Sequence, residues 1–357
     1  MTTVHNAARS QINYASDRLR PVRIWLYAMA GLVLLMVVVG GITRLTGSGL
    51  SITSWKPISG TIPPLNDLQW QAEFDAYKQI PQYEVNNSWM SLDDFKFIYF
   101  WEFVHRLLGR LLGVAFLVPF LVFLVQKRFT PQLAWPLFGL FLLGGFQGLL
   151  GWWMVSSGLS VLTSVSQYRL AAHLTAACLL FIALVYVPRS LEPGRISGVD
   201  PSRNIGSAVV LLVLIILQIG AGAFVAGLDA GMSYNTWPLM DGALVPNGLD
   251  VMQPFWKNLF ENALTVQFIH RTLAYVILAY LAVLIWQQRA AGGFSGVHGW
   301  LPRIGLLVLL QVVLGIGTLL MAVPTSLAVG HQALAFMLAG VTLAYIADMQ
   351  RAARVTR

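Results

Sequence analysis

Four of the six histidines in this sequence stand inside long apolar segments, at His105, His173, His270 and His331. An imidazole in hydrocarbon needs a partner, because an unpaired polar group there costs on the order of several kcal/mol. A lone buried histidine is most simply explained by a hydrogen bond between helices. Four of them, one early in each of four apolar segments, favour metal ligation instead. We assign no role to His5 and His298, which lie in polar segments.

The kind of metal follows from the number of ligands. Two histidines on facing helices suit a haem iron, which takes one axial nitrogen from each side. Zinc and copper sites gather more nitrogen, sulfur or oxygen ligands around one ion. The sequence therefore predicts two haem sites, His105 with His173 and His270 with His331.

A single carboxylate makes these two sites unequal. Glu102 lies three residues before His105 and so on the same helix face, whereas the matching position before His270 is Gln267. A carboxylate in an apolar span is costly and indicates function. Glu102 is thus a candidate to accept a proton or stabilise positive charge. An ion pair with Arg106, four residues on, is the structural alternative, and the two roles are compatible.

Three arginines are candidates to bind haem propionates. Arg106 and Arg271 each follow a histidine directly, and Arg44 follows the first apolar segment. A guanidinium is a strong donor to a carboxylate. The same side chains are equally able to reach toward lipid headgroups, which leaves both interpretations of Arg106 and Arg271 open.

The composition requires a membrane to position these residues. Of 357 residues 57% are hydrophobic and only 11% charged, too few to cover a water-exposed surface. The net charge of +8 does not indicate nucleic-acid binding, because the basic residues fall between the apolar segments. We predict an all-α integral membrane protein with eight transmembrane helices, at about 24–43, 96–125, 133–155, 169–187, 206–228, 263–287, 304–323 and 327–347.

The basic residues also predict the orientation. Fourteen Lys or Arg lie on the side of the termini and six in the loops of the other side, where most acidic residues gather. Both termini are therefore expected in the cytoplasm, or in a mitochondrial matrix. The short N-terminal extension favours a bacterial inner membrane over a mitochondrial one.

The eight helices form two copies of a four-helix unit. Gly49, Trp55 and Gly60 recur 182 residues later, Gln147 recurs as Gln311, and the histidines recur at shrinking offsets. Because each unit holds an even number of helices, the repeat is parallel. We expect a cytoplasmic tail (1–23), a first repeat (24–190), a cytoplasmic linker (191–205), a second repeat (206–348) and a final tail (349–357).

These motifs resemble the haem A synthase family over nearly the whole chain. The segment from Gly40 to Ser51 looks like the family's first outer loop, and Asn235 to Met240 like its second. The segments 102–106 and 267–271 look like its two helix motifs. Residues 44–95 contain no cysteine, so the chain resembles the members that lack a cysteine pair there. The one cysteine, Cys178, is expected to be a small buried residue.

The resemblance implies that haem O is oxidised at its C8 methyl to a formyl group, giving haem A for terminal oxidases. It implies a reaction site in the first repeat, with Glu102, His105 and His173 catalytic. It also implies a bis-histidine haem b on His270 and His331. A haem O synthase and oxidase assembly factors are the expected partners, besides membrane lipid and a possible second copy of the chain.

Two other classes of protein fit parts of the pattern. A di-haem b-type electron-transfer cytochrome explains four histidines equally well, but not the difference between Glu102 and Gln267. A transporter or haem carrier explains a parallel repeat, but the chain lacks the broken helix pairs and intramembrane charge pairs of that class. Neither the electron acceptor nor the source of the formyl oxygen follows from the sequence.

Overall fold

The computed structural model describes residues 2–56, 59–160, 162–193 and 205–355. Within these ranges the backbone forms helices and loops, with an isolated β-bridge between Met240 and Ala243. Part of the expected linker, residues 194–204, lies outside the described residues.

Eight helices in the described ranges are long and apolar enough to cross a membrane, which confirms the predicted number. They are α1 (Thr2–Leu45), α3 (Leu92–Val125), α4 (Pro131–Ser156), α5 (Gln167–Ser190), α6 (Ile205–Gly227), α8 (Ala263–Ala290), α9 (Trp300–Leu320) and α10 (Thr325–Val355).

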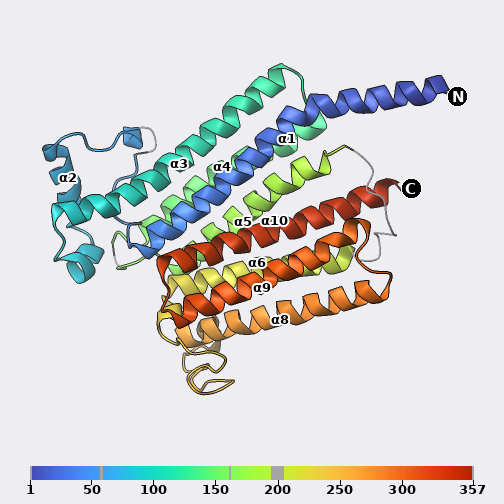
Figure 1. Ribbon diagram of the computed structural model, residues 1–357. Coiled ribbons are helices and arrows are strands. Elements are labelled where there is room, and N and C mark those ends of the chain that lie inside the picture. The colour runs from blue at the N-terminus through green and yellow to red at the C-terminus, as the bar shows by residue number, and fades with distance from the viewer. Residues whose placement is uncertain (1, 57–58, 161, 194–204, 356–357) are drawn as a thin grey trace.

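Helix α1 begins much earlier than the apolar segment that predicts it. Hydropathy detects only its spanning part, Arg18–Leu45. Residues 2–20 are polar but contain no glycine or proline to interrupt a helix, and Pro21 lies inside α1. Figure 1 shows this first part of α1 running on beyond the other helices, at the end of the bundle where the C-terminus also lies. We call this the termini end.

The helices pack as two neighbouring groups. Helices α1, α3, α4 and α5 contact one another, as do α6, α8, α9 and α10. Helices α1, α5, α6 and α10 meet between the groups and form a central wall. Small residues permit close approach there: a Cβ on Gly41 of α1 would lie 3.2 Å from Val329 of α10. Gln332 of α10 donates to the carbonyl oxygen of Val37 across the same contact, at 2.9 Å.

The loop between α1 and α3 is an ordered cap at the opposite end of the bundle. It holds the short helices η1 (Ser59–Thr61), α2 (Asp67–Tyr77) and η2 (Tyr83–Asn87). Leu50, Phe74 and Tyr77 pack against Phe95 and Tyr99 at the start of α3. Burial raises the pKa of the Tyr77 hydroxyl, which therefore stays protonated. This hydroxyl donates a hydrogen bond to the side-chain oxygen of Gln82 at 2.9 Å. We call this end the cap end.

The loop between α6 and α8 covers the second group. It contains η4 (Ala230–Met232), η5 (Phe255–Lys257) and α7 (Asn258–Glu261). Asn258 is fully buried. Its side-chain oxygen accepts from the backbone N–H of Met252 at 3.0 Å, and its side-chain nitrogen donates to the Met252 carbonyl oxygen at 2.9 Å. The two caps thus differ in construction, although each follows the first helix of its group.

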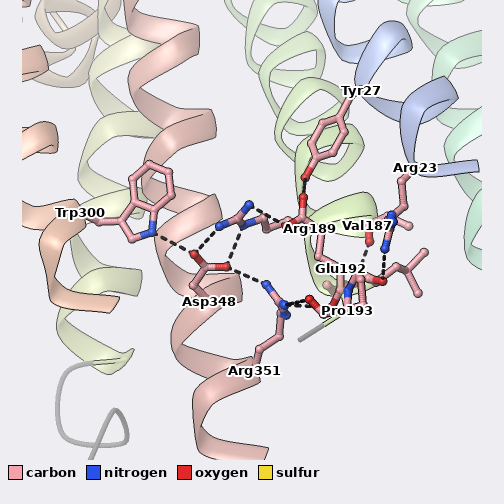
Figure 2. Close-up of polar contacts among 11 residues, drawn as sticks. Arg23, Tyr27, Val187, Arg189, Glu192, Pro193, Trp300, Asp348 and Arg351 are labelled. Carbon is pink, nitrogen blue, oxygen red and sulfur yellow. Dashed lines mark hydrogen bonds and ion pairs between the residues drawn. The ribbon is translucent and has the colours of Figure 1, made fainter. Parts of the chain in front are cut away.

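A charged cluster ties the groups together at the termini end (Figure 2). Arg189 of α5 forms two 2.7 Å bonds to the buried Asp348 of α10. Trp300 of α9 and Arg351 donate to the same carboxylate, at 2.9 and 3.2 Å. Tyr27 of α1 reaches the neighbouring Glu192 at 3.0 Å. Four helices from both groups are therefore joined by one network.

Candidate functional site: two histidine pairs

The histidines lie on alternate helices of each group. His105 is on α3 and His173 on α5, while His270 is on α8 and His331 on α10. The ring centres of His270 and His331 are 6.4 Å apart, with their planes at 76°. His105 and His173 lie on the corresponding helices of the first group. The structure therefore brings the expected pair His270 and His331 together, and it places His105 and His173 on the matching helices of the other group.

The separation of the second pair suits an ion between the rings. A metal–imidazole nitrogen bond is about 2.0–2.1 Å long. Two such bonds, added to the distance from the bound nitrogen to the centre of each ring, come close to the 6.4 Å that separates the ring centres of His270 and His331. His270 and His331 are therefore spaced so that they would hold a haem iron through one imidazole nitrogen each.

Each histidine ring rests against a glycine of a neighbouring helix. A Cβ on Gly40 of α1 would lie 3.0 Å from Cε1 of His105, and one on Gly222 of α6 would lie 3.1 Å from Cε1 of His270. The corresponding distances are 2.9 Å for Gly315 of α9 to His331, and 3.5 Å for Gly151 of α4 to His173. A Cβ on Gly315 would be closer to the ring than real Cβ atoms come, and one on Gly40 or Gly222 would require the ring to shift by a few tenths of an ångström. Glycine at these positions therefore helps to fix where the rings lie.

The ring nitrogens of the four histidines lack protein partners on one side. The Nδ1 atoms of His105, His173, His270 and His331 are all buried, and none has a hydrogen-bond partner among the described residues. A buried polar atom without a partner costs about 1–3 kcal/mol and calls for an explanation. The other ring nitrogens of His270 and His331, the Nε2 atoms, lie 3.3 and 3.4 Å from the side-chain nitrogens of Gln218 and Gln311. Each imidazole thus has one ring nitrogen without a partner among the described residues, which fits a group that binds through nitrogen, as haem iron does.

Glutamines distinguish the two pairs. The Nε2 of Gln218 on α6 donates to the backbone oxygen of His270 at 3.0 Å, and Gln311 on α9 donates to that of His331 at 2.9 Å. The residue 164 positions before Gln311 is Gln147, whose two amide atoms are buried without a partner among the described residues. The residue 182 positions before Gln218 is Met36. Both histidines of the second pair are thus held by glutamine, unlike those of the first.

Glu102 is fixed by the cap and by its own helix. It is buried, and one carboxylate oxygen accepts from the Ser51 hydroxyl and the Ile52 backbone N–H, both at 2.8 Å. Its other oxygen accepts from Nε of Arg106 at 2.9 Å. Both oxygens are therefore engaged by donors, as suits an ionised carboxylate. The pair with Arg106 that the sequence offered as the structural role is present, and it leaves a charged group beside the first histidine pair.

The second group has the arginine contact but not the carboxylate. Arg106 donates to the carbonyl oxygens of Ile52 and Ser54, at 2.7 and 3.0 Å. In the same manner Arg271 donates to those of Tyr234 and Thr236, at 2.7 and 2.8 Å, residues that lie 182 positions later. Gln267 reaches Tyr234 at 3.3 Å, and its own side-chain oxygen is buried without a partner in the described part of the chain.

Arg44 connects the two caps. It donates to Asp229, just beyond the end of α6, at 2.9 Å, and to the carbonyl oxygen of Ala226 in the last turn of α6 at 2.8 Å. Its Nε is buried and has no partner among the described residues, as is also true of Arg271.

Among the remaining residues considered from the sequence, Cys178 is free and fully buried, as expected. His298, to which no role was assigned, is also buried, 3.2 Å from the Tyr345 hydroxyl. Sequence reasoning gave no role at the site to Gln218 or to the four glycines. The repeat offsets place Gly40 with Gly222 and Gly151 with Gly315, and this was the available signal.

The fold and the site define a class, a multi-pass helical membrane protein with four histidines inside its spanning helices, two of them 6.4 Å apart, and a buried carboxylate on α3. The family of cytochrome oxidase assembly proteins matches residues 23–343. A haem A synthase of Azorhizobium caulinodans is 54% identical over 340 residues, which cover 95% of each chain. Those of Allorhizobium ampelinum and Parvibaculum lavamentivorans are 49% and 50% identical, over 95% and 90% of this chain and 93% and 92% of their own. This chain therefore belongs to the haem A synthase family.

Proposed function

We propose that this protein is a haem A synthase, which oxidises the C8 methyl group of haem O to a formyl group. The names of its relatives support this activity. The observation that carries it in the structure is the inequality of the two histidine pairs. One pair has the buried carboxylate of Glu102 beside it, and the other has the neutral Gln267. Two identical electron-transfer sites would not need this difference.

The second pair, His270 and His331, would hold a resident haem b. The ring separation of 6.4 Å and the bonds from Gln218 and Gln311 support this assignment. A bound haem b supplies a centre that accepts and releases single electrons. The residues of this half hold and orient it, and the neutral Gln267 places no charged acid or base beside it.

The first pair, His105 and His173, would bind the substrate haem O. Oxidation of a methyl group to a formyl group replaces two of its hydrogens with an oxygen atom and withdraws electrons from the carbon. Where electrons leave before a proton does, positive charge develops beside the porphyrin. Glu102 is suited to stabilise this charge or to take up a proton. The bonds from Ser51 and Ile52 hold the carboxylate at a fixed position, which avoids the cost of reorganising it during the reaction.

Arginines at the cap end would bind the propionates. Arg44 and Arg271 each keep a buried Nε without a partner among the described residues, and a propionate oxygen would satisfy it. The three guanidinium nitrogens of Arg106 already donate to Glu102, Ile52 and Ser54, so its main part in this proposal is to position Glu102.

The wider organisation is also part of the proposal. Residues 24–190 and 206–348 would be two parallel repeats, supported by the matching arginine and glycine contacts in each half. Both termini would lie in the cytoplasm of a bacterium, supported by their position at one end of the bundle. Haem O synthase and terminal oxidase assembly factors would be partners, and a homo-oligomer would be compatible.

Haem extraction tests the proposed activity. Membranes that contain haem O synthase, with and without this protein, would be extracted and their haems separated by chromatography. We expect haem A only where this protein is present, together with haem b in the purified protein. Two haem b per chain and no conversion of haem O would support the di-haem cytochrome instead, and a protein without haem would support the transporter.

A further inference from the structure

A large groove opens at the termini end of the first helix group. It has a volume of about 1330 Å³ and lies between α1, α3 and α4. Its residues are of two kinds. Arg18, Lys127 and Arg128 are basic, and Phe120, Trp135 and Phe138 are representative of its apolar lining.

The basic residues are not neutralised by acidic side chains. Arg18 donates to the backbone oxygen of Lys127, and Arg128 donates to the Gln126 side chain at 2.6 Å and to the backbone oxygen of Arg18 at 3.4 Å. Among the side chains that the structure describes, no carboxylate pairs with any of the three. Within the described part of the chain, the three positive charges of the groove therefore have only neutral hydrogen-bond partners.

The other charged cluster at the termini end is built differently. There Arg189 and Arg351 surround the buried Asp348, and Glu192 completes the network (Figure 2). In that cluster the charged side chains pair with one another and hold the helices together. Among the described side chains, the groove has the same kind of cation without a matching carboxylate, so a ligand is a suitable source of the balancing anion.

The apolar lining shows what kind of anion fits. Trp135 and Phe138 are 72% and 37% exposed, on a helix that is expected to face hydrocarbon. The groove exceeds the roughly 300–1,000 Å³ of a typical small-molecule pocket. A ligand must combine a negative group for the rim with a long apolar body for the walls. Basic pockets between membrane helices on the cytoplasmic side bind anionic lipids in this way.

We propose that this groove is a binding site for an anionic phospholipid. Its phosphate lies among Arg18, Lys127 and Arg128, and an acyl chain follows Trp135 and Phe138 toward the middle of the membrane. The site is separate from both histidine pairs and does not depend on the proposed catalytic activity. It matches the expected orientation, because anionic lipids are most abundant in the leaflet that the termini would face.

Native mass spectrometry of the purified full-length protein tests this site. Wild type would be compared with the triple variant Arg18→Gln, Lys127→Gln, Arg128→Gln. The matched control is Arg20→Gln, Arg289→Gln, Arg303→Gln, which removes the same charge from the same end of the bundle but not from the groove. Each protein would be titrated with phosphatidylglycerol and, separately, with phosphatidylcholine.

We expect wild type and control to retain phosphatidylglycerol in preference to phosphatidylcholine. The groove variant should bind phosphatidylglycerol about 100-fold more weakly, since each cation near an anionic lipid contributes about five-fold in affinity. Equal binding by the groove and control variants would overturn the proposal, as would equal binding of the two lipids. Displacement of the lipid by millimolar inorganic phosphate would show instead a site for a free anion.

A second measurement uses the unaltered chain, in case the triple variant does not fold. Phosphatidylglycerol with a photoreactive acyl chain would be crosslinked in membranes and the modified peptides mapped. Labelling should concentrate on the groove face of α4, at Trp135 and Phe138. Uniform labelling of all exposed helix faces would contradict a specific site.

Discussion

Gly315 of α9 lies so close to His331 that a Cβ on the glycine would be 2.9 Å from Cε1 of the imidazole. Real Cβ atoms do not approach another atom so closely, so Gly315→Ala must displace the ring. Metal–ligand distances tolerate a change of only about 0.2 Å. We expect this variant to bind haem b about 10–100-fold more weakly, the usual cost of disturbing the support of a ligand.

The control for this variant is Gly317→Ala on the same helix, where the nearest contact of a Cβ would be an ordinary 3.9 Å to Leu327. Haem content per protein and the optical spectrum would be measured in both. Equal haem binding by the two variants would contradict the idea that glycine fixes the position of His331.

Direct removal of a ligand tests the cofactor assignment. His270→Ala or His331→Ala should each abolish the low-spin bis-histidine spectrum or lose the pigment, while the protein still accumulates in the membrane. Electron paramagnetic resonance and pyridine haemochrome measurements would follow the two effects. A bis-histidine signal that persists in both variants would exclude this pair as the haem b site.

Substitution of Glu102 tests the catalytic role. Glu102→Gln retains an acceptor for Arg106 but loses the charge, so it makes the first site like the second. A general base typically contributes about 10²–10⁴-fold, and haem A formation should fall by a factor in that range. Haem O or a hydroxylated intermediate should accumulate, with haem b unchanged. Ser51→Ala removes one of the bonds to the carboxylate and should cause a smaller loss. Near-normal haem A from Glu102→Gln would leave only the structural role.

The network around Asp348 predicts a stability effect without a direct effect on haem chemistry. Asp348→Ala leaves Arg189 and Arg351 without their shared carboxylate. We expect a loss of about 3 kcal/mol, the lower end for breaking a buried pair, because Arg189 is partly exposed. Thermal unfolding of the purified protein would measure it. Lys96→Gln removes an exposed pair with Asp93 and should cost about 0–1 kcal/mol. Equal Tm values for both variants would contradict this prediction.

The orientation can be tested with reporter fusions. Fusions after residues 75 and 250 should report the periplasmic side, and those after 128, 197 and 295 the cytoplasmic side. The reversed pattern would place the caps and Glu102 toward the cytoplasm, and would remove the argument that the lipid groove faces the anionic leaflet.

The eight spans could be predicted because a membrane imposes long apolar helices, and hydropathy reads these directly. The pairing of His270 with His331 was accessible from their matching positions early in alternate helices. The cap over Glu102 was not, because its bonds from Ser51 and Ile52 depend on how an irregular segment packs. The role of Gln218 was missed because its counterpart is Met36, so no repeated residue type marked it.

The contact between α10 and α1 in the central wall has a consequence for electron flow under the proposed function. Gln332 directly follows His331 in sequence and donates to the carbonyl oxygen of Val37. Val37 lies three residues before Gly40, against which the ring of His105 rests. A continuous path of covalent bonds, one hydrogen bond and one van der Waals contact thus joins a histidine of each site. Under that proposal, electrons taken from a substrate in the first half would have a route through protein to the second, and the second site would act as an internal electron relay.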